Sequence, residues 1–169
     1  MKQAVLDGIN EQIKNELYSG YLYLGMSSHF EMENLKGFAH WMRLQAQEEL
    51  EHAIRLFDHA ARRGARVTLQ AIEAPPPADG TPLSLFQRAL DHERHVTRSI
   101  NELYRLARQE NEYATELELQ WFVQEQVMEE DNAATAVDQL ALAGDNKAAL
   151  LMLDRQFGQR VGTEAGPVA

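Results

Sequence analysis

The 169-residue sequence contains no cysteine and no hydrophobic run long enough to span a lipid bilayer. Without cysteine the chain forms neither disulfide bonds nor thiolate ligands, which excludes disulfide-stapled folds and soft-metal sites. The first residues, MKQAVLDGIN, contain no apolar core of a secretory signal. We therefore expect a cytoplasmic protein that has no membrane segment.

Basic residues are also scarce, with 16 Lys and Arg against 26 Asp and Glu, and the formal net charge is −10. Nucleic acid is not expected as a partner, because binding phosphate groups requires a basic surface. An acidic surface favours solubility and attracts cations. The length suits one domain with a sizeable core, so we expect a single domain over residues 1–169.

Helix-breaking residues are concentrated at a few positions, and the apolar residues between them recur at helical spacing. Thr81 and Pro82 are typical of the N-cap and first turn of a helix. The pattern predicts four long helices and a short fifth one, over about residues 3–33, 37–64, 82–110, 113–143 and 146–157. The tail over about 159–169 is expected to be flexible.

Connection lengths predict the topology. Short turns make the first and second long helices antiparallel neighbours, and likewise the third and fourth. The linker over about 65–81 is long for a compact domain, but an extended chain of this length spans a helix bundle from end to end. We predict an all-α fold, a four-helix bundle with one long crossover between helices two and three plus a short fifth C-terminal helix.

The segment 44–57 has the apolar spacing of a buried helix, to which Leu50 and Ile54 contribute. Yet Glu49 and His52 lie three residues apart, on one face of that helix. A single Glu-x-x-His pair is a weak signal, because such pairs are common on the surfaces of acidic helices.

Similar polar residues interrupt the apolar faces near the midpoints of all four long helices. They are Glu16, Glu49, His52, Glu93, Gln126 and Glu129. Glu16 and His52 are about equally far from the first predicted turn, and Glu93 and Glu129 are equally far from the second. Antiparallel helices bring such residues to the same height, so these side chains should converge at one level of the bundle.

Four carboxylates buried together would repel one another and lose their solvation. Two divalent cations would neutralise their four negative charges. Oxygen ligands with one imidazole suit iron or manganese better than copper. The common height of these groups across four helices therefore predicts a dinuclear metal site.

Three segments resemble those of bacterial non-haem ferritins in order and spacing, NEQIKNELYSGYLYL, AQEELEHAIRLF and LQWFVQEQVMEE. The resemblance covers about residues 3–160. It implies an iron-storage protein with ferroxidase activity, which oxidises Fe(II) with O2 or peroxide and deposits ferric mineral inside a hollow cage. It also implies a homo-oligomer of 24 subunits.

The same resemblance assigns roles around a di-iron centre. Glu16 and His52 would ligate the first iron, and Glu49 would bridge the two ions. Glu93 and Glu129 would ligate the second iron. The resemblance thus makes Glu49 the residue on which catalysis depends most.

Two further residues belong near this centre by resemblance. Gln126 would lie beside the second iron. Bacterioferritins have a histidine at the equivalent of Glu129, whereas Gln126 together with Glu129 resembles the ferroxidase centre of true ferritins. Tyr23 matches a tyrosine of the family close to the centre, and the resemblance implies a catalytic role for it beside Glu49. A buried aromatic residue with one hydrogen bond is the alternative interpretation of Tyr23.

A third iron site on the cavity side is a further implication of the resemblance. Its ligands would be Glu48, Glu125 and Glu129. Relatives often have another glutamate where this chain has Met128, which weakens the site. Haem is not expected, because Leu50 stands where haem-binding relatives have a methionine.

Two other functions stay open. One is a ferritin-like di-iron or di-manganese oxidoreductase that forms no cage. The other is a non-catalytic ferritin-like shell subunit. Aerobic Fe(II) oxidation, measured together with the mass of the assembled protein, separates these three possibilities.

Overall fold

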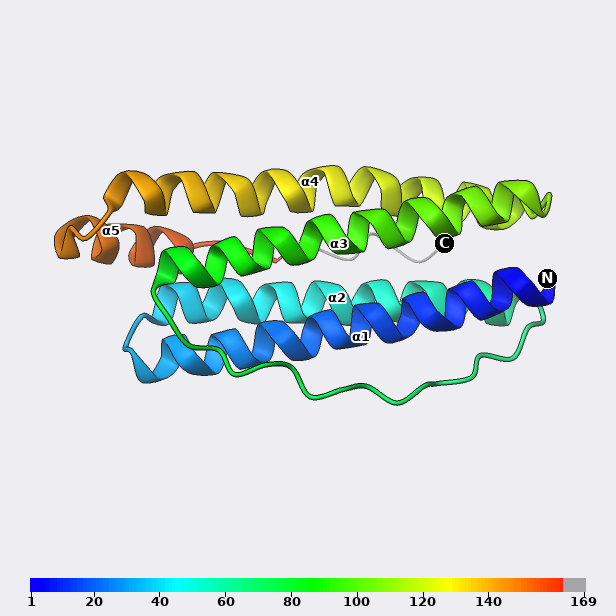
Figure 1. Ribbon diagram of the computed structural model, residues 1–169, viewed down its shortest axis with the longest axis horizontal. Coiled ribbons are helices and arrows are strands. Elements are labelled where there is room, and N and C mark those ends of the chain that lie inside the picture. The colour runs from blue at the N-terminus through cyan, green and yellow to red at the C-terminus, as the bar shows by residue number, and fades with distance from the viewer. Residues whose placement is uncertain (163–169) are drawn as a thin grey trace.

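The computed structural model describes residues 1–162 and consists of helices joined by turns and one long crossover. Its helices are α1 (Gln3–Met32), α2 (Lys36–Arg62), α3 (Pro82–Gln109), α4 (Tyr113–Ala143) and α5 (Lys147–Phe157). The four long helices lie side by side along one axis, and α5 lies at one end of the bundle (Figure 1). This arrangement confirms the predicted fold. None of the described helices is long and apolar enough to cross a membrane.

Left-handed backbone conformations close the two short turns. Asn34, between α1 and α2, has φ 58°, and Asn111, between α3 and α4, has φ 57°. Asparagine tolerates this conformation better than most residues. Helix α2 ends at Arg62, slightly before the predicted end, and Gly64 follows with φ 67°. Both turns are short enough to keep their helices antiparallel.

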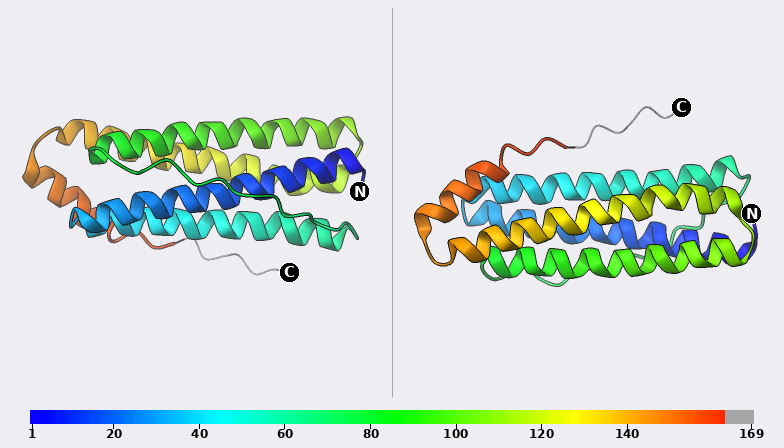
Figure 2. Two further views of the ribbon diagram at one scale, coloured as in Figure 1. Left: turned by 60° about the horizontal axis from the view of Figure 1, so that its bottom comes forward. Right: turned by 90° about the horizontal axis from the view of Figure 1, so that it is seen from above.

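The crossover over residues 63–81 runs in extended form along the outside of α1 (Figures 1 and 2). The Asn10 side chain fixes it to α1 by accepting a hydrogen bond from the Thr68 amide at 3.1 Å. Where the crossover ends, the Thr81 hydroxyl accepts from the Ser84 amide at 3.2 Å. The predicted cap of α3 is therefore confirmed, with Pro82 as its first residue.

Two separate apolar clusters form the core. The cluster near the α1–α2 turn is rich in aromatic residues and includes Phe30, Phe38, Trp41, Phe86 and Phe157. The cluster at the opposite end of the bundle is mainly aliphatic and includes Ile9, Leu56, Ile100, Leu103 and Leu119. In every long helix, the polar residues singled out from the sequence lie between the residues of these two clusters.

Helix α5 docks against the start of α2. The Asp154 carboxylate accepts hydrogen bonds from the backbone amides of Gly37 (2.8 Å) and Phe38 (2.9 Å), which have no partner within α2. A Cβ atom at position 37 would lie 1.5 Å from the Asp154 carbonyl oxygen. Only glycine therefore permits this contact, and Asp154 acts as a helix cap supplied by another helix.

One expectation about α2 is wrong. Leu50 and Ile54 are about half exposed, at 49% and 50%, although their spacing predicted burial. The face of α2 that packs into the bundle carries Glu49 and His52 instead. Helix α2 thus has two apolar faces, and periodicity alone does not show which of them meets the neighbouring helices.

Candidate metal centre

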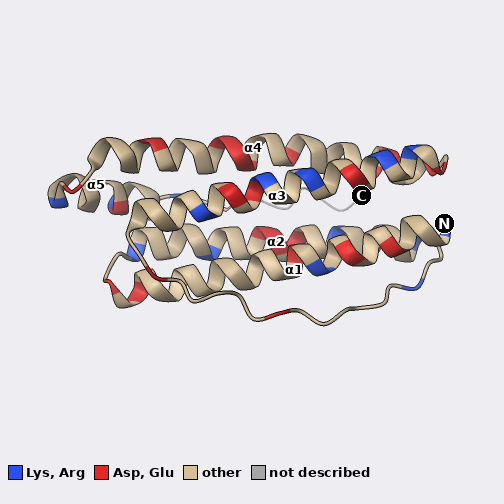
Figure 3. Cartoon of the chain, viewed as in Figure 1, with Lys and Arg blue, Asp and Glu red and all other residues tan. Residues whose placement is uncertain are grey.

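All four long helices contribute polar side chains to the middle of the bundle, where Figure 3 shows acidic residues on neighbouring helices. The six predicted residues Glu16, Glu49, His52, Glu93, Gln126 and Glu129 are all buried. None of them is more than 5% exposed. Burying so many acidic groups is costly unless hydrogen bonds, protons or cations compensate them.

One half of the centre lies between α1 and α2. Glu16, Glu49 and His52 each offer a ligand atom, and these atoms lie within 4.8 Å of one another. The His52 Nδ1 atom is 3.6 Å from Glu49 Oε2. The Gln12 amide donates a hydrogen bond to Glu16 Oε1 at 2.8 Å. No amide, hydroxyl or imidazole of the described residues donates to the other buried oxygens, Glu16 Oε2 and Glu49 Oε2. The two carboxyl groups lie close enough to hydrogen-bond to each other when they share a proton.

The pKa values of Glu16 and Glu49 in this half are raised above those of free carboxyl groups. Burial raises the pKa of Glu16 well above 4.5, and the negative charge of Glu49 raises it further. Burial likewise raises the pKa of Glu49, and the charge of Glu93 adds to the effect. Either protons or cations must therefore neutralise this half of the centre near neutral pH.

The other half is formed by the carboxylates of α3 and α4, and hydrogen bonds already hold them. Glu93 accepts from the Tyr23 hydroxyl and, at 3.2 Å, from the Gln126 amide. Glu129 Oε2 accepts from the Gln45 amide at 2.8 Å. The donors thus include residues of α1 and α2, which connect the two halves.

The pKa values of this second half lie near neutrality. Burial raises the pKa of Glu93 to about 7, against the opposing effect of the hydrogen bonds from Tyr23 and Gln126. Burial also raises the pKa of Glu129 to about 7, and the charge of Glu93 contributes. Tyr23 itself has a pKa well above 10, because it is buried next to Glu93.

The residues predicted for a third iron site are only partly gathered. Glu125 and Glu129 offer ligand atoms within 4.8 Å of each other and of His52. Glu48 is buried, but its carboxylate pairs with the Arg160 guanidinium at 2.8 Å. Met128 is 51% exposed and lines a surface pocket between α3 and α4.

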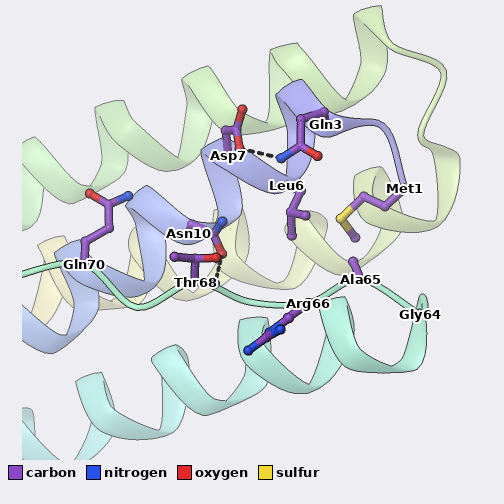
Figure 4. Close-up of a pocket in the computed structure, with 10 residues that line it drawn as sticks. All are labelled: Met1, Gln3, Leu6, Asp7, Asn10, Gly64, Ala65, Arg66, Thr68 and Gln70. Carbon is purple, nitrogen blue, oxygen red and sulfur yellow. Dashed lines mark hydrogen bonds between the residues drawn. The ribbon is translucent and has the colours of Figure 1, made fainter.

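The composition of the centre fits a hard cation. Carboxylate oxygens predominate, a single imidazole is added, and no described amide, hydroxyl or imidazole donates to two of the buried oxygens. Iron and manganese suit such a donor set. By contrast, a surface pocket of about 730 Å³ at the start of α1 and the crossover is lined mainly by aliphatic and amide groups (Figure 4). Its one carboxylate, Asp7, provides no comparable cluster.

Sequence reasoning missed three residues that hold the carboxylates in place. Gln12 and Gln45 each lie four residues before a predicted ligand, Glu16 and Glu49 respectively, and thus on the same helix face. That spacing is a signal which could have identified both glutamines. Arg160 lies in the part of the tail predicted to be flexible, and no local pattern marks it. Residues 163–169 of that tail lie outside the described residues.

Comparisons with known proteins identify the family. Residues 6–143 match the family described as a ferritin-like domain. The chain is 42% identical to a bacterial non-heme ferritin of Bacteroides fragilis, covering 95% of this chain and 99% of the relative. It is 32% identical to a bacterial non-heme ferritin of Staphylococcus aureus, with 97% and 99% covered.

Solved structures give the same result. The crystal structure of an open pore ferritin from the archaeon Archaeoglobus fulgidus matches with a TM-score of 0.93 and 46% identity. The match covers 95% of this chain and 99% of that one. An all-helical bundle, a buried carboxylate centre and full-length relatives thus point in one direction. The chain belongs to the ferritin family of iron-storage proteins.

Proposed function

We propose that this chain oxidises Fe(II) at a dinuclear ferroxidase centre and deposits the ferric product as a stored mineral. The observation that carries the proposal is the pair of buried oxygens, Glu16 Oε2 and Glu49 Oε2, to which no described amide, hydroxyl or imidazole donates, so that only a shared proton or a cation can satisfy them. A buried acceptor without a donor is costly, and a cation between these groups would compensate it. The relatives named bacterial non-heme ferritins support iron as this cation.

In this proposal each half of the centre holds one ion. Glu16 and His52 bind the first iron, and Glu93 and Glu129 bind the second. By family resemblance Glu49 bridges the two, and its position beside His52, with its charge interacting with that of Glu93, supports this role. Both ions are substrates that move on after oxidation.

The proposed reaction transfers electrons from iron to the oxidant, and metal binding releases protons from the ligands. Two Fe(II) ions give one electron each, and the two electrons with two protons reduce O2 to hydrogen peroxide or hydrogen peroxide to water, so that both irons become Fe(III) and the chain is not consumed. Raised pKa values mean that part of Glu93 and Glu129 is protonated near neutral pH, so metal binding releases protons. Gln126 and Tyr23 orient Glu93 through their hydrogen bonds.

A homo-oligomeric cage, of 24 subunits by family resemblance, is the second part of the proposal. Exposed apolar side chains occur on α2, at Leu50, Ile54 and Phe57, and on α5, at Leu151 and Met152. Apolar surface of this kind marks contacts between proteins. In such an assembly Leu50 offers no sulfur ligand, so we propose that the chain binds no haem.

A third iron position would use Glu125 and Glu129, with Glu48 as a possible further ligand. Glu125 and Glu129 are close enough to share an ion, with His52 on the same side. Glu48 is engaged by Arg160 and would have to exchange that partner.

The test combines mass with activity. Size-exclusion chromatography with light scattering should give the mass of a 24-subunit particle. Aerobic addition of Fe(II) should give rapid oxidation, followed in the near-ultraviolet. Rapid oxidation by a particle of low mass would instead identify a non-cage oxidoreductase. A large particle that oxidises Fe(II) no faster than buffer would identify a non-catalytic shell subunit.

A further inference from the structure

The side chain of Arg160 reaches a carboxylate of the metal centre from outside the helix bundle. Arg160 follows shortly after the end of α5, and its side chain in the ion pair is only 19% exposed. Its Nη2 donates to Glu48 Oε2 at 2.8 Å, and its Nη1 donates to the Gln45 side-chain oxygen. One guanidinium therefore holds two residues of α2.

Two further contacts fix the position of Arg160. Its guanidinium lies 4.8 Å from the centroid of the Trp41 ring, and its backbone carbonyl is 2.9 Å from His40 Nε2. These partners, with Gln45 and Glu48, follow one another along a single face of α2. A planar cation that stacks on an aromatic ring and bonds through both terminal nitrogens is held more firmly than an exposed surface pair.

Contact with Gln45 extends the influence of Arg160 to a proposed iron ligand. The Gln45 amide oxygen accepts from Arg160, and its amide nitrogen donates to Glu129 Oε2 at 2.8 Å. Arg160 thus fixes which way the Gln45 amide points, because only one orientation satisfies both partners. The guanidinium is linked directly to Glu48 and through one amide to Glu129.

We propose that Arg160 is a tethered cation at the third iron position, where it competes with an iron ion for Glu48 and positions Glu129 through Gln45. The inference rests on the proposed function. Arginine stays positively charged at every relevant pH, so it cannot make way for iron by losing a proton. An ion bound at Glu48, Glu125 and Glu129 must displace the guanidinium or lie close to another positive charge.

Competition from Arg160 affects Fe(III) more than Fe(II). Repulsion by Arg160 rises with the charge of the ion, so it disfavours Fe(III) at this position more than Fe(II). Ferric iron is therefore held weakly there and passes on to the mineral. Arg160 would set how many ions a subunit retains, without taking part in the oxidation.

A simpler role for Arg160 is to anchor the end of the chain against α2. Both roles predict a loss of stability when Arg160 is replaced, so thermal unfolding does not separate them. The number and affinity of bound ions do separate them, because a purely structural role predicts no change in ion binding when Arg160 is replaced.

The test is an anaerobic Fe(II) titration of the assembled protein, with ions counted per subunit, for wild type and Arg160→Gln. We expect the variant to bind a third ion about tenfold to a hundredfold more tightly, the scale of one charge-assisted hydrogen bond. Arg43→Gln is the matched control. Arg43 lies on α2, the helix that Arg160 contacts, and pairs with Glu31 at 2.8 Å on the exposed surface, and its replacement changes the net charge by the same amount.

Two more variants complete the design. Arg160→Lys keeps the charge but loses the forked geometry, so its third-ion affinity should lie between those of wild type and Arg160→Gln. If Arg160→Gln does not assemble, the third-ion affinity of Arg160→Lys tests the proposal instead. Adding Glu48→Gln to Arg160→Gln should remove the extra ion again, because it removes the shared ligand.

The proposal is overturned if third-ion affinity in Arg160→Gln and Arg160→Lys equals that of wild type, or if Arg43→Gln changes it as much. It is also overturned if the third ion persists after Glu48→Gln. If the proposed function itself is wrong, the experiment gives a different result. In that case wild type would not bind the first two ions, and it would not oxidise Fe(II) rapidly.

Discussion

The two halves of the metal centre contain the same kind of side chain in different states. In the half between α1 and α2, Glu16 and Glu49 each have a buried oxygen to which no described amide, hydroxyl or imidazole donates. In the half formed by α3 and α4, Glu93 and Glu129 accept hydrogen bonds from Tyr23 and from glutamines. The first half thus requires a shared proton or a cation, whereas the second is largely satisfied by hydrogen bonds from the chain itself.

This difference indicates an order of binding. A cation in the first half displaces protons and competes with one hydrogen bond, from Gln12 to Glu16. A cation in the second half must compete with hydrogen bonds that already stabilise the carboxylates. The centre should therefore fill from α1 and α2 toward α3 and α4.

The largest effect is expected from replacing Glu49, the residue that we propose to serve both halves. Glu49→Gln should slow rapid Fe(II) oxidation by about a hundredfold or more, because the bridge between the ions is lost. The metal-free variant should unfold at a higher temperature than wild type, since one buried acidic group is gone. Stopped-flow absorbance and calorimetry measure the two effects.

Glu51→Gln is the control for this substitution. Glu51 lies on the same helix but is exposed, so both the oxidation rate and the unfolding temperature should stay near the wild-type values. Wild-type oxidation by Glu49→Gln would show that the bridge is assigned to the wrong residue.

A sharper comparison replaces one ligand in each half. Glu16→Gln should weaken the first Fe(II) ion bound in an anaerobic titration, by about tenfold to a hundredfold. Glu129→Gln should leave that ion in place and weaken only the second. If both variants lose the same ion, the halves fill together and the proposed order is wrong.

The protonation of the second half predicts a dependence on pH. Glu93 and Glu129 have pKa values of about 7 in the folded chain against 4.5 ordinarily, so the folded state binds more protons between these values. Their contribution to the unfolding free energy is complete below about pH 4.5 and is lost as pH rises through 7. The metal-free protein should therefore lose a few kcal/mol of stability between pH 5 and pH 8.

Chemical unfolding of the metal-free protein across this range measures the effect. Glu93→Gln supplies the internal comparison, because it removes one of the two groups whose pKa is about 7 and should flatten the profile near neutral pH. Saturating Mn(II) should reverse the trend, since the ion binds the deprotonated carboxylates. A metal-free profile that rises toward pH 8 would contradict the assignment of raised pKa values.

The smallest expected effect concerns the hydrogen bond between Tyr23 and Glu93. Tyr23→Phe removes the donor and keeps the ring, so oxidation should change by about twofold to tenfold while the number of bound ions stays the same. Tyr21→Phe is the control, because Tyr21 lies on the same helix and is exposed. A loss as large as that of Glu49→Gln would indicate that Tyr23 takes part in the electron transfer itself.

Much of this architecture follows from local patterns. Helical spacing and breakers such as Gly64 predict the helices to within a few residues, because both act through the backbone nearby. The height of the polar residues predicts the centre, because turn positions fix how antiparallel helices align. Neither argument needs knowledge of side-chain contacts.

What could not be predicted depends on contacts between distant segments. Leu50 and Ile54 are exposed, since their burial depends on which face of α2 meets the other helices. Gln45 is four residues from Glu49 but bonds to Glu129 on another helix. Arg160 reaches Glu48 only because α5 docks at the start of α2. Spacing along one helix contains no information about such pairings.

The absence of a side chain at Gly37 has a consequence for assembly. Because α2 and α5 meet without room for one more carbon atom, and Asp154 caps α2, the direction of α5 is set within the single subunit. Leu151 and Met152 are then presented at a fixed angle before any second subunit approaches. Association of subunits does not have to immobilise this helix, so less conformational entropy is lost at the contact. In the proposed cage, the orientation of the α5 contact would therefore depend on the hydrogen atom that Gly37 has in place of Cβ.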